Sequence, residues 1–293
     1  MGNQCASREK MSEAGQTAKE KFYQLKETAK NKWYGTPTEG QPQEEKQQID
    51  YEEKRLRYGQ YKQEFVTDHS QISMISQFES TLPLTKIDVD EFERRLKMLA
   101  TSNSLNKEQI IESFRDSTAL REIVSKDSIV QQLLLDELMM DKRKQNYLIA
   151  QLLLLANLYC PSNPSLKAQK FFELCQENLD SQISQNDKEL RLLFGKMLEI
   201  TYTFMIGLYM ANKSSSDPDI PEEWYNDESK LEDAYDSMFE EFQNAVFKSK
   251  TRNTREEFLD ELSQNNRSWL QPHYLRQRIF NKVTGIEKLR IDK

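Results

Sequence analysis

Glycine and histidine are scarce in this chain, and their scarcity excludes several common catalytic sites. Only Gly195 and Gly207 lie between residues 61 and 284, so a glycine-rich phosphate loop or a dinucleotide-binding turn cannot be built there. The two histidines, His69 and His273, are too far apart in sequence to form a zinc-ligand pair or a nucleophile–base motif. No pattern of catalytic residues is present, and we expect a protein that is not an enzyme.

Cysteines and long apolar runs are equally few. Cys5, Cys160 and Cys175 are too few and too scattered for a disulfide framework, and no apolar signal sequence precedes them. The longest apolar run, residues 148–158, is about half the length that crosses a bilayer. We therefore expect a cytoplasmic protein without a membrane-spanning helix.

The charge balance disfavours nucleic acid as a partner. The chain carries 41 Lys and Arg against 48 Asp and Glu, a net charge of -7. A basic excess occurs only in residues 1–35, which contain seven basic and four acidic residues. Nucleic-acid binding requires a basic surface on the folded part of the chain, which this composition does not provide.

The chain begins Met1-Gly2-Asn3-Gln4-Cys5, which is typical of a doubly acylated N-terminus. Removal of Met1 would expose Gly2 for myristoylation, and Cys5 is placed for palmitoylation. Two acyl chains anchor a protein stably, whereas one binds only marginally. The motif prefers Ser or Thr at position 6, where this chain has Ala6, and the alternative is an ordinary terminus. We expect a lipid anchor on the cytoplasmic face of a membrane.

Residues 1–48 are predicted to be a disordered tail. Within it Phe22, Leu25, Ala29 and Trp33 recur at helical spacing among lysines, which fits either an interfacial helix on an anionic membrane surface or a solvated linker. Residues 35–48, which are rich in Gln, Glu, Pro and Gly, are expected to form a flexible tether.

From residue 49 onward, apolar residues recur at intervals of three and four with few Gly or Pro, which predicts an all-α fold. We expect a helical region over 49–210, a polar insertion over 211–230 and a last helical unit with a tail over 231–293. A generic helical bundle would show the same periodicity.

One polar stretch between two predicted helices, residues 176–187, resembles an EF-hand loop. Its eighth position is Ile183, and matching the family pattern places weak metal ligands on Asn178, Asp180 and Asp187. The first ligand position is Gln176 instead of a carboxylate, and Asp187 is shorter than the usual bidentate Glu. This loop is the best candidate for Ca²⁺ or Mg²⁺ binding, and we expect weak affinity.

Three further stretches resemble EF-hand loops whose ligands are lost: residues 99–109, 140–151 and 246–257. Lysines occupy cation-facing positions in the second and third, and Ser-Asn-Ser replaces acids in the first. Together with the stretch after Phe258 and the acylation signal, these units are similar to the calcineurin B, calcineurin B-like and neuronal calcium sensor proteins. The resemblance implies paired EF-hand-like helix-loop-helix lobes and a groove for an amphipathic partner helix.

The ten methionines suit either the walls of such a groove or an ordinary core. The leading hypothesis is a membrane-tethered, non-catalytic adaptor that binds a partner helix without calcium or any other cofactor. The alternatives are a weak Ca²⁺ or Mg²⁺ sensor through loop 176–187, and a structural subunit of a cytoskeletal or membrane assembly.

Overall fold

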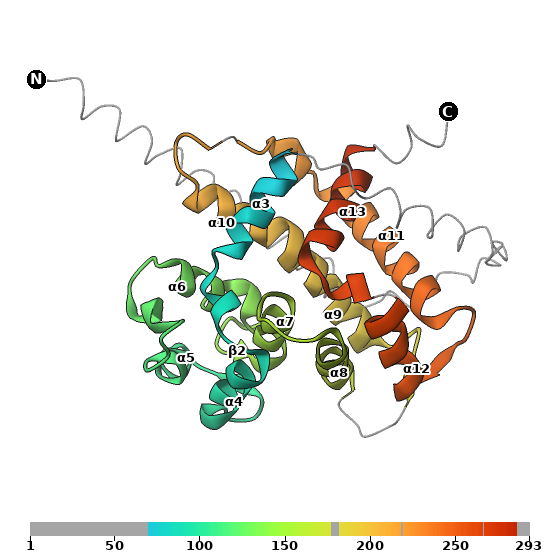
Figure 1. The fold of residues 1–293 in the computed structure, drawn as a ribbon, viewed down its shortest axis with the longest axis horizontal. Coiled ribbons are helices and arrows are strands. Elements are labelled where there is room, and N and C mark those ends of the chain that lie inside the picture. Colours follow the sequence, from blue (N-terminus) through green and yellow to red (C-terminus); the bar gives the residue numbers. More distant parts are fainter. Residues whose placement is uncertain (1–69, 177–181, 218, 266, 286–293) are drawn as a thin grey trace, which may run out of the picture.

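The structure is a computed structural model that describes residues 70–176, 182–217, 219–265 and 267–285 (Figure 1). It is mostly helical, which confirms the predicted all-α class. The α-helices are α3 Ser70–Ser80, α4 Val89–Leu99, α5 Lys107–Phe114, α6 Ile129–Leu134, α7 Ile149–Tyr159, α8 Pro164–Cys175, α9 Lys188–Glu199, α10 Met205–Asn212, α11 Glu228–Phe247, α12 Arg255–Asp260 and α13 Pro272–Thr284. The strands are β1 Ser104–Leu105, β2 Tyr147–Leu148, β3 Gln182–Ser184 and β4 Arg252–Thr254.

Shorter helical segments complete the described chain. The 3₁₀ segments are η1 Pro83–Lys86, η2 Arg121–Val124, η3 Glu137–Met139, η5 Glu222–Trp224 and η7 Arg267–Leu270, and the π segments are η4 Ile200–Phe204 and η6 Glu261–Asn265. Within the described residues, none of the helices combines the length and the apolar character needed to cross a membrane.

Two short antiparallel ladders pair the helices into two groups. Strand β1, between α4 and α5, pairs with β2, which directly precedes α7, and aligns Leu105 with Tyr147. Strand β3, between α8 and α9, pairs with β4, between α11 and α12, and aligns Ile183 with Asn253. Each ladder therefore joins the loops of two helix-strand-helix units that are distant in sequence.

Side-chain caps explain where several helices begin. Asp88 caps α4, Asn163 caps α8 with Pro164 in the first turn, and both Asn106 of α5 and Thr254 of α12 form complete capping boxes. Each cap satisfies backbone N–H groups that lack a partner inside the helix. In α5 and α12 the cap therefore fixes the point at which the helix begins after strand β1 or β4.

Helices α9 and α10 form one long helix that is interrupted by the π segment η4. The predicted polar insertion over 211–230 corresponds to the end of α10, the connection after Asn212 and η5. Helix α3 packs on α10 and α13 in the upper part of Figure 1, although some 190 residues separate α3 from α13. The first and last helices that the structure describes thus lie side by side.

Ion pairs between α4 and α8 hold the two groups of helices together. Lys170 Nζ lies 2.8 Å from Asp90 Oδ1 and 2.5 Å from Glu93 Oε2. Burial lowers the pKa of Lys170, but the hydrogen bonds with Asp90 and Glu93 outweigh burial and raise it. Lys170 is therefore a permanently charged tie between the two groups.

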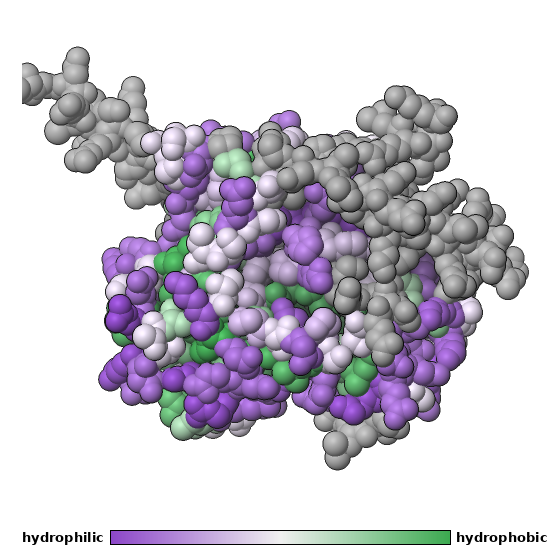
Figure 2. Space-filling model, in the orientation of Figure 1, coloured by the Kyte–Doolittle hydropathy of each residue, from purple (hydrophilic) through white to green (hydrophobic). Residues whose placement is uncertain are grey.

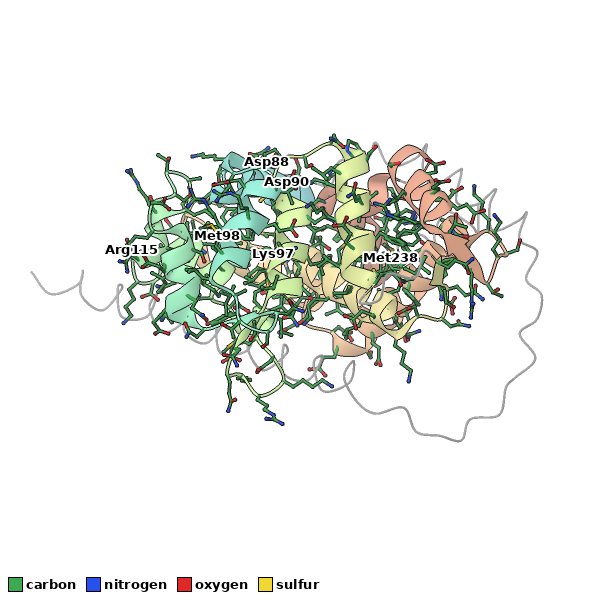
Figure 3. The ribbon with its side chains drawn as sticks, turned by 90° about the horizontal axis from the view of Figure 1, so that it is seen from below. Asp88, Asp90, Lys97, Met98, Arg115 and Met238 are labelled. Atoms are coloured by element: carbon green, nitrogen blue, oxygen red, sulfur yellow. The ribbon has the colours of Figure 1, made fainter. Side chains whose placement is uncertain are left out.

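The core runs through both groups, and the surface is largely polar. Figure 2 shows hydrophilic residues around the edge of the described surface and apolar residues nearer its middle. Among the described residues, the exposed large hydrophobic side chains are Met98, Leu99 and Val124. Met98 is an exposed residue of α4, whereas Met238 is a buried residue of α11 (Figure 3).

Candidate functional site

Of the site residues predicted from the sequence, the structure describes one, in the loop before α9. Asp187 is described by the structure, whereas Gly2, Cys5, Asn178 and Asp180 lie outside the described residues. Asp187 Oδ1 accepts hydrogen bonds from the backbone N–H of Glu189 at 2.8 Å and of Leu190 at 3.3 Å. Its carboxylate therefore serves as the N-cap of α9.

An ammonium group faces the carboxylate at the end of loop 246–257. Lys250 Nζ lies 2.7 Å from Glu257 Oε1, and the backbone N–H of Thr254 donates to Glu257 Oε2 at 2.8 Å. The Lys250 hydrogen bond lowers the pKa of Glu257, and the Thr254 N–H lowers it further. The side chain that the EF-hand pattern assigns to the twelfth ligand position is thus neutralised by a lysine of its own loop.

In loop 140–151, backbone N–H groups stabilise the charge of a loop carboxylate. Asp141 Oδ1 accepts from the N–H groups of Arg143 and Gln145, each at 3.0 Å. The N–H of Gln145 is the main cause of the lowered pKa of Asp141. Lys144 Nζ pairs with Glu137 Oε2 at 2.9 Å, so cationic side chains and turn N–H groups stabilise this loop.

A side-chain amide closes loop 99–109. Ser102 and Asn103 adopt positive φ angles of 51° and 60°, which make a tight turn. Gln109 donates from Nε2 to the backbone oxygen of Leu99 at 2.8 Å and completes the capping box with Asn106. The final position of this loop therefore bonds to its first residue.

The donor sets of loops 99–109, 140–151 and 246–257 do not fit a calcium ion. Calcium takes six to eight oxygen ligands, several of them carboxylates, whereas these loops present lysines, amides and carboxylates that are already bonded. Across the part of the chain that the structure describes, no group of three or more His, Cys, Asp and Glu is arranged to hold a metal ion.

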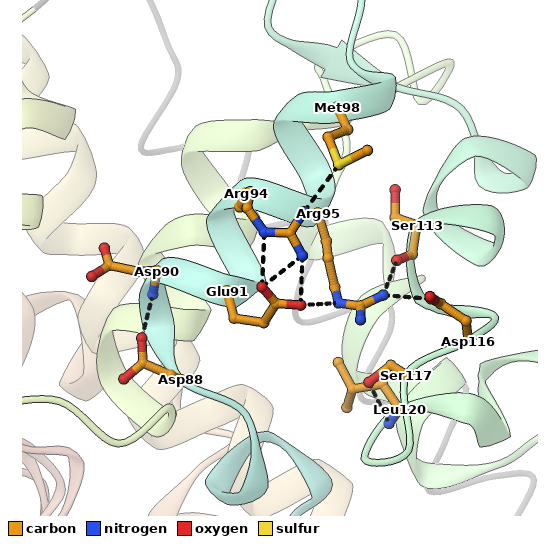
Figure 4. Close-up of polar contacts among 10 residues, drawn as sticks. All are labelled: Asp88, Asp90, Glu91, Arg94, Arg95, Met98, Ser113, Asp116, Ser117 and Leu120. Atoms are coloured by element: carbon orange, nitrogen blue, oxygen red, sulfur yellow. Dashed lines mark hydrogen bonds and ion pairs between the residues drawn. The ribbon is translucent and has the colours of Figure 1, made fainter.

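A shallow hollow of about 380 Å³ lies beside α4, between Lys86 and the loop at Ser117. Arg95 crosses its wall and donates to Glu91 Oε1 at 2.6 Å, to Asp116 Oδ1 at 2.5 Å and to the Ser113 backbone oxygen at 3.3 Å (Figure 4). The guanidinium group thus ties α4 to the end of α5.

The carboxylates around this hollow form ion pairs with arginines, which does not suit them to proton transfer. Hydrogen bonds from Arg94 and Arg95 lower the pKa of Glu91, and the bond from Arg95 lowers that of Asp116. A general acid needs a carboxyl that stays protonated near neutral pH, which these lowered values do not provide. The arrangement is suited to holding two helices together.

Sequence reasoning missed a buried charged cluster that involves Glu79 of α3 and Arg276 of α13. The guanidinium of Arg276 donates from Nη1 to Glu79 Oε1 at 2.5 Å and from Nη2 to Oε2 at 2.6 Å. Tyr159 of α7 donates to Glu79 Oε1 at 2.9 Å, and Arg276 also donates to the Thr201 backbone oxygen in η4 at 3.2 Å. This bidentate pair joins four elements in the interior.

A weak signal for this cluster does exist in the sequence. Arg276 shares its helical face with Phe280 and Val283, four and seven positions later, so the apolar stripe of α13 runs through an arginine. Arg276 is fully buried. A charge on an apolar stripe indicates a buried partner, but the sequence alone cannot identify that partner as Glu79.

Most of the methionines and both described cysteines belong to the core. Four of the methionines proposed as groove walls are 0 % exposed: Met139, Met197, Met205 and Met238. Burial raises the pKa of Cys160 to about 12 and also raises that of Cys175. These side chains are packing groups, which was the alternative interpretation of the methionines.

Comparison of the chain with protein-family models, with curated proteins and with solved structures finds no match in any of the three. A functional proposal therefore depends on the residues and geometry described above.

Proposed function

We propose that this protein is a membrane-tethered, non-catalytic adaptor built from two pairs of EF-hand-like units, which binds a partner helix without needing calcium. The pairing of the loops supports this proposal. Counting from the start of each predicted loop 140–151, 176–187 and 246–257, the eighth positions are Tyr147, Ile183 and Asn253. Ile183 pairs with Asn253, and Tyr147 pairs with Leu105.

The contact between Lys250 and Glu257 carries the calcium-independent part of the proposal. In a calcium sensor, binding of the ion supplies the free energy that opens a pair of units. Here Lys250 supplies the positive charge next to the carboxylate, so the loop is neutralised without an ion. Side-chain packing then sets the separation of the helices at all calcium concentrations.

The membrane-tethering part rests on Gly2 and Cys5. Two acyl chains, together with the basic excess of residues 1–35, would hold the body against an anionic membrane surface. The adaptor would then present a bound protein partner at that surface.

Calorimetric titration of the full chain with Ca²⁺ and Mg²⁺ tests the calcium-independent part. We expect no binding heat and no change in far-ultraviolet circular dichroism at millimolar ion. Two control variants remove carboxylates from loop 176–187: Asp180→Asn, and Asp187→Asn, which retains a good N-cap residue for α9. Heat in the natural chain that both variants abolish would contradict the proposal and favour the sensor alternative.

Fractionation of cells that express the full chain tests the tether. We expect the protein in the membrane fraction, with an N-terminal peptide whose mass includes one myristoyl and one palmitoyl group. Gly2→Ala should move the protein to the soluble fraction, and Cys5→Ser should weaken its membrane association. An unmodified Gly2 in the membrane-bound natural chain would refute the tether.

A further inference from the structure

The described surface offers little free apolar area for a partner helix. Its exposed large hydrophobic side chains are Met98, Leu99 and Val124, and Met98 lies within 3.3 Å of the guanidinium of Arg94. Helix-binding proteins bury a row of apolar anchors in a groove, which three such side chains do not provide. A partner helix must therefore use a surface that another helix of this chain already covers.

Helix α3 covers such a surface, formed by α10, α13 and η4. Ile75 points into the core and is fully buried, and the ring of Phe78 packs edge-on against Tyr209 of α10 at 5.7 Å between centroids. Ser76 accepts a hydrogen bond from Arg276 Nη2 at 3.0 Å. We name the area around Thr201, Tyr209 and Arg276 the α3 docking surface.

The contacts of α3 follow the pattern of a groove-binding helix. Ile75, Phe78 and Glu79 occupy positions i, i+3 and i+4, which form one face of α3. Ile75 is 0 % exposed, and Glu79 is 7 % exposed. The position that follows the apolar anchors is thus a carboxylate, and it pairs with a buried arginine.

Arg276 determines the chemistry of any helix that covers this surface. Its guanidinium is buried, and an arginine stays charged in a protein, so the covering helix must supply a carboxylate. When the covering helix leaves, water hydrates both charges, so their separation recovers much of the desolvation cost. An ion pair of this kind gives specificity while permitting exchange.

We propose that the α3 docking surface is the site where the partner helix binds, with α3 as its occupant in the free protein. The partner is an amphipathic helix with apolar residues at i and i+3 and an Asp or Glu at i+4, which replaces Glu79 on Arg276. This inference rests on the proposed adaptor function and identifies the helix that the adaptor accepts.

A synthetic peptide of residues 70–86, labelled with fluorescein, is the probe for exchange at this surface. It is titrated into the full chain and into the full-length Phe78→Ala variant, which weakens α3 without leaving a buried charge. We expect at least tenfold tighter binding to Phe78→Ala than to the natural chain. A peptide carrying Glu79→Gln should bind Phe78→Ala at least tenfold more weakly, and Arg276→Gln in the receptor should remove that difference.

Hydrogen exchange of the same two proteins separates release of α3 from general unfolding. In Phe78→Ala we expect amides of α3 to exchange at least tenfold faster, while those of α4 to α7 keep their natural rates. Equal acceleration in α9 to α13 would show that α3 is an integral part of the core and would overturn the proposal. Equal binding of the two peptides, or binding of neither to Phe78→Ala, would also overturn it.

Sedimentation of Phe78→Ala addresses the remaining occupant, α3 of a second copy. A monomer is expected, whereas a dimer would overturn the assignment of the surface to a foreign helix. None of these measurements uses metal ions or acylated protein. Failure of the ion titration or of the membrane fractionation is therefore distinguishable from failure of this inference.

Discussion

Phe242 of α11 lies at the centre of an aromatic cluster, and its truncation tests how the second group of helices is held together. The side chain is 0 % exposed. Its ring centroid is 4.4 Å from that of Phe194 in α9, 5.5 Å from that of Trp269 in η7 and 6.5 Å from that of Phe171 in α8. One side chain thus contacts three other elements, two of them in the neighbouring helix-strand-helix unit.

The expected loss in Phe242→Ala follows from burial and ring contacts. Truncation of a buried Phe to Ala costs about 3–5 kcal/mol, because apolar contact is lost and a cavity remains. Each favourable ring pair adds about 0.5–1.5 kcal/mol beyond its buried area, so we expect a loss of about 4–5 kcal/mol. Phe242→Leu retains most of the volume and should cost roughly 1–2 kcal/mol.

Urea unfolding of the full chain, followed by tryptophan fluorescence and circular dichroism, measures these losses. Val124→Ala is the matched control, since Val124 is 57 % exposed and its truncation should change stability by less than about 0.5 kcal/mol. A loss below about 1 kcal/mol in Phe242→Ala, or one equal to that of Val124→Ala, would refute the assignment of Phe242 to a packed core that joins the two units.

Three further predictions concern caps, pH and thiols. Thr254→Ala removes the capping box of α12 and should cost about 1 kcal/mol in urea unfolding, whereas Thr254→Ser should retain most of that stability. Burial raises the pKa of Glu93, but hydrogen bonds from Lys170 and Lys97 outweigh it, so the folded pKa lies below the ordinary 4.5. The stabilising contribution of Glu93 is therefore complete above pH 4.5 and is lost as the pH falls through the folded pKa. Lys170→Met should make the decline of the unfolding free energy between roughly pH 5 and pH 3 less steep. An acid-unfolding profile identical to that of the natural chain would contradict the ion pair. Cys160 and Cys175 are buried with raised pKa values, so an aromatic disulfide reagent should label them only in denaturant, and rapid labelling of either in the folded protein would place that thiol at the surface.

Local signals were sufficient to predict the helical character of the chain and the position of one loop. The periodic run from Leu190 to Leu208 lies within the long helix of α9, η4 and α10. The polar stretch that ends at Asp187 lies between α8 and α9, as predicted, and the structure places Ile183 in strand β3 within it. Periodicity and capping act between residues close in sequence, which explains why these features could be predicted.

Contacts between distant segments could not be predicted from the same signals. Glu79 and Arg276 are 197 residues apart, and the apolar stripe around Arg276 indicates a buried partner without identifying it as Glu79. The π segment η4 also lacks an evident local cause, because no Pro interrupts the run from Ile200 to Phe204. Its Thr201 backbone oxygen accepts from Arg276, so this irregular turn is stabilised by a residue of α13.

Helices α3 and α13 pack against each other, and the side chains that each buries decide which one can be exchanged. Helix α3 places one fully buried apolar side chain, Ile75, and the half-buried Met74 and Phe78 against the body. Helix α13 buries five apolar side chains: Tyr274, Leu275, Ile279, Phe280 and Val283. Complete burial of such a side chain contributes about 1.5–3 kcal/mol, so α13 is held several times more strongly than α3.

Charges reinforce the difference between the two helices. Arg278 pairs with Glu241 of α11 as well as with Tyr274 within its own helix, and Lys282 Nζ lies 2.7 Å from Glu241 Oε1. Departure of α13 would break its two pairs with Glu241 and the pair between Glu79 and Arg276, whereas departure of α3 breaks only the last of these three ion pairs. A helix that competes for this surface therefore displaces α3 and leaves α13 in place, with Arg276 still on the body to receive the carboxylate of the incoming helix.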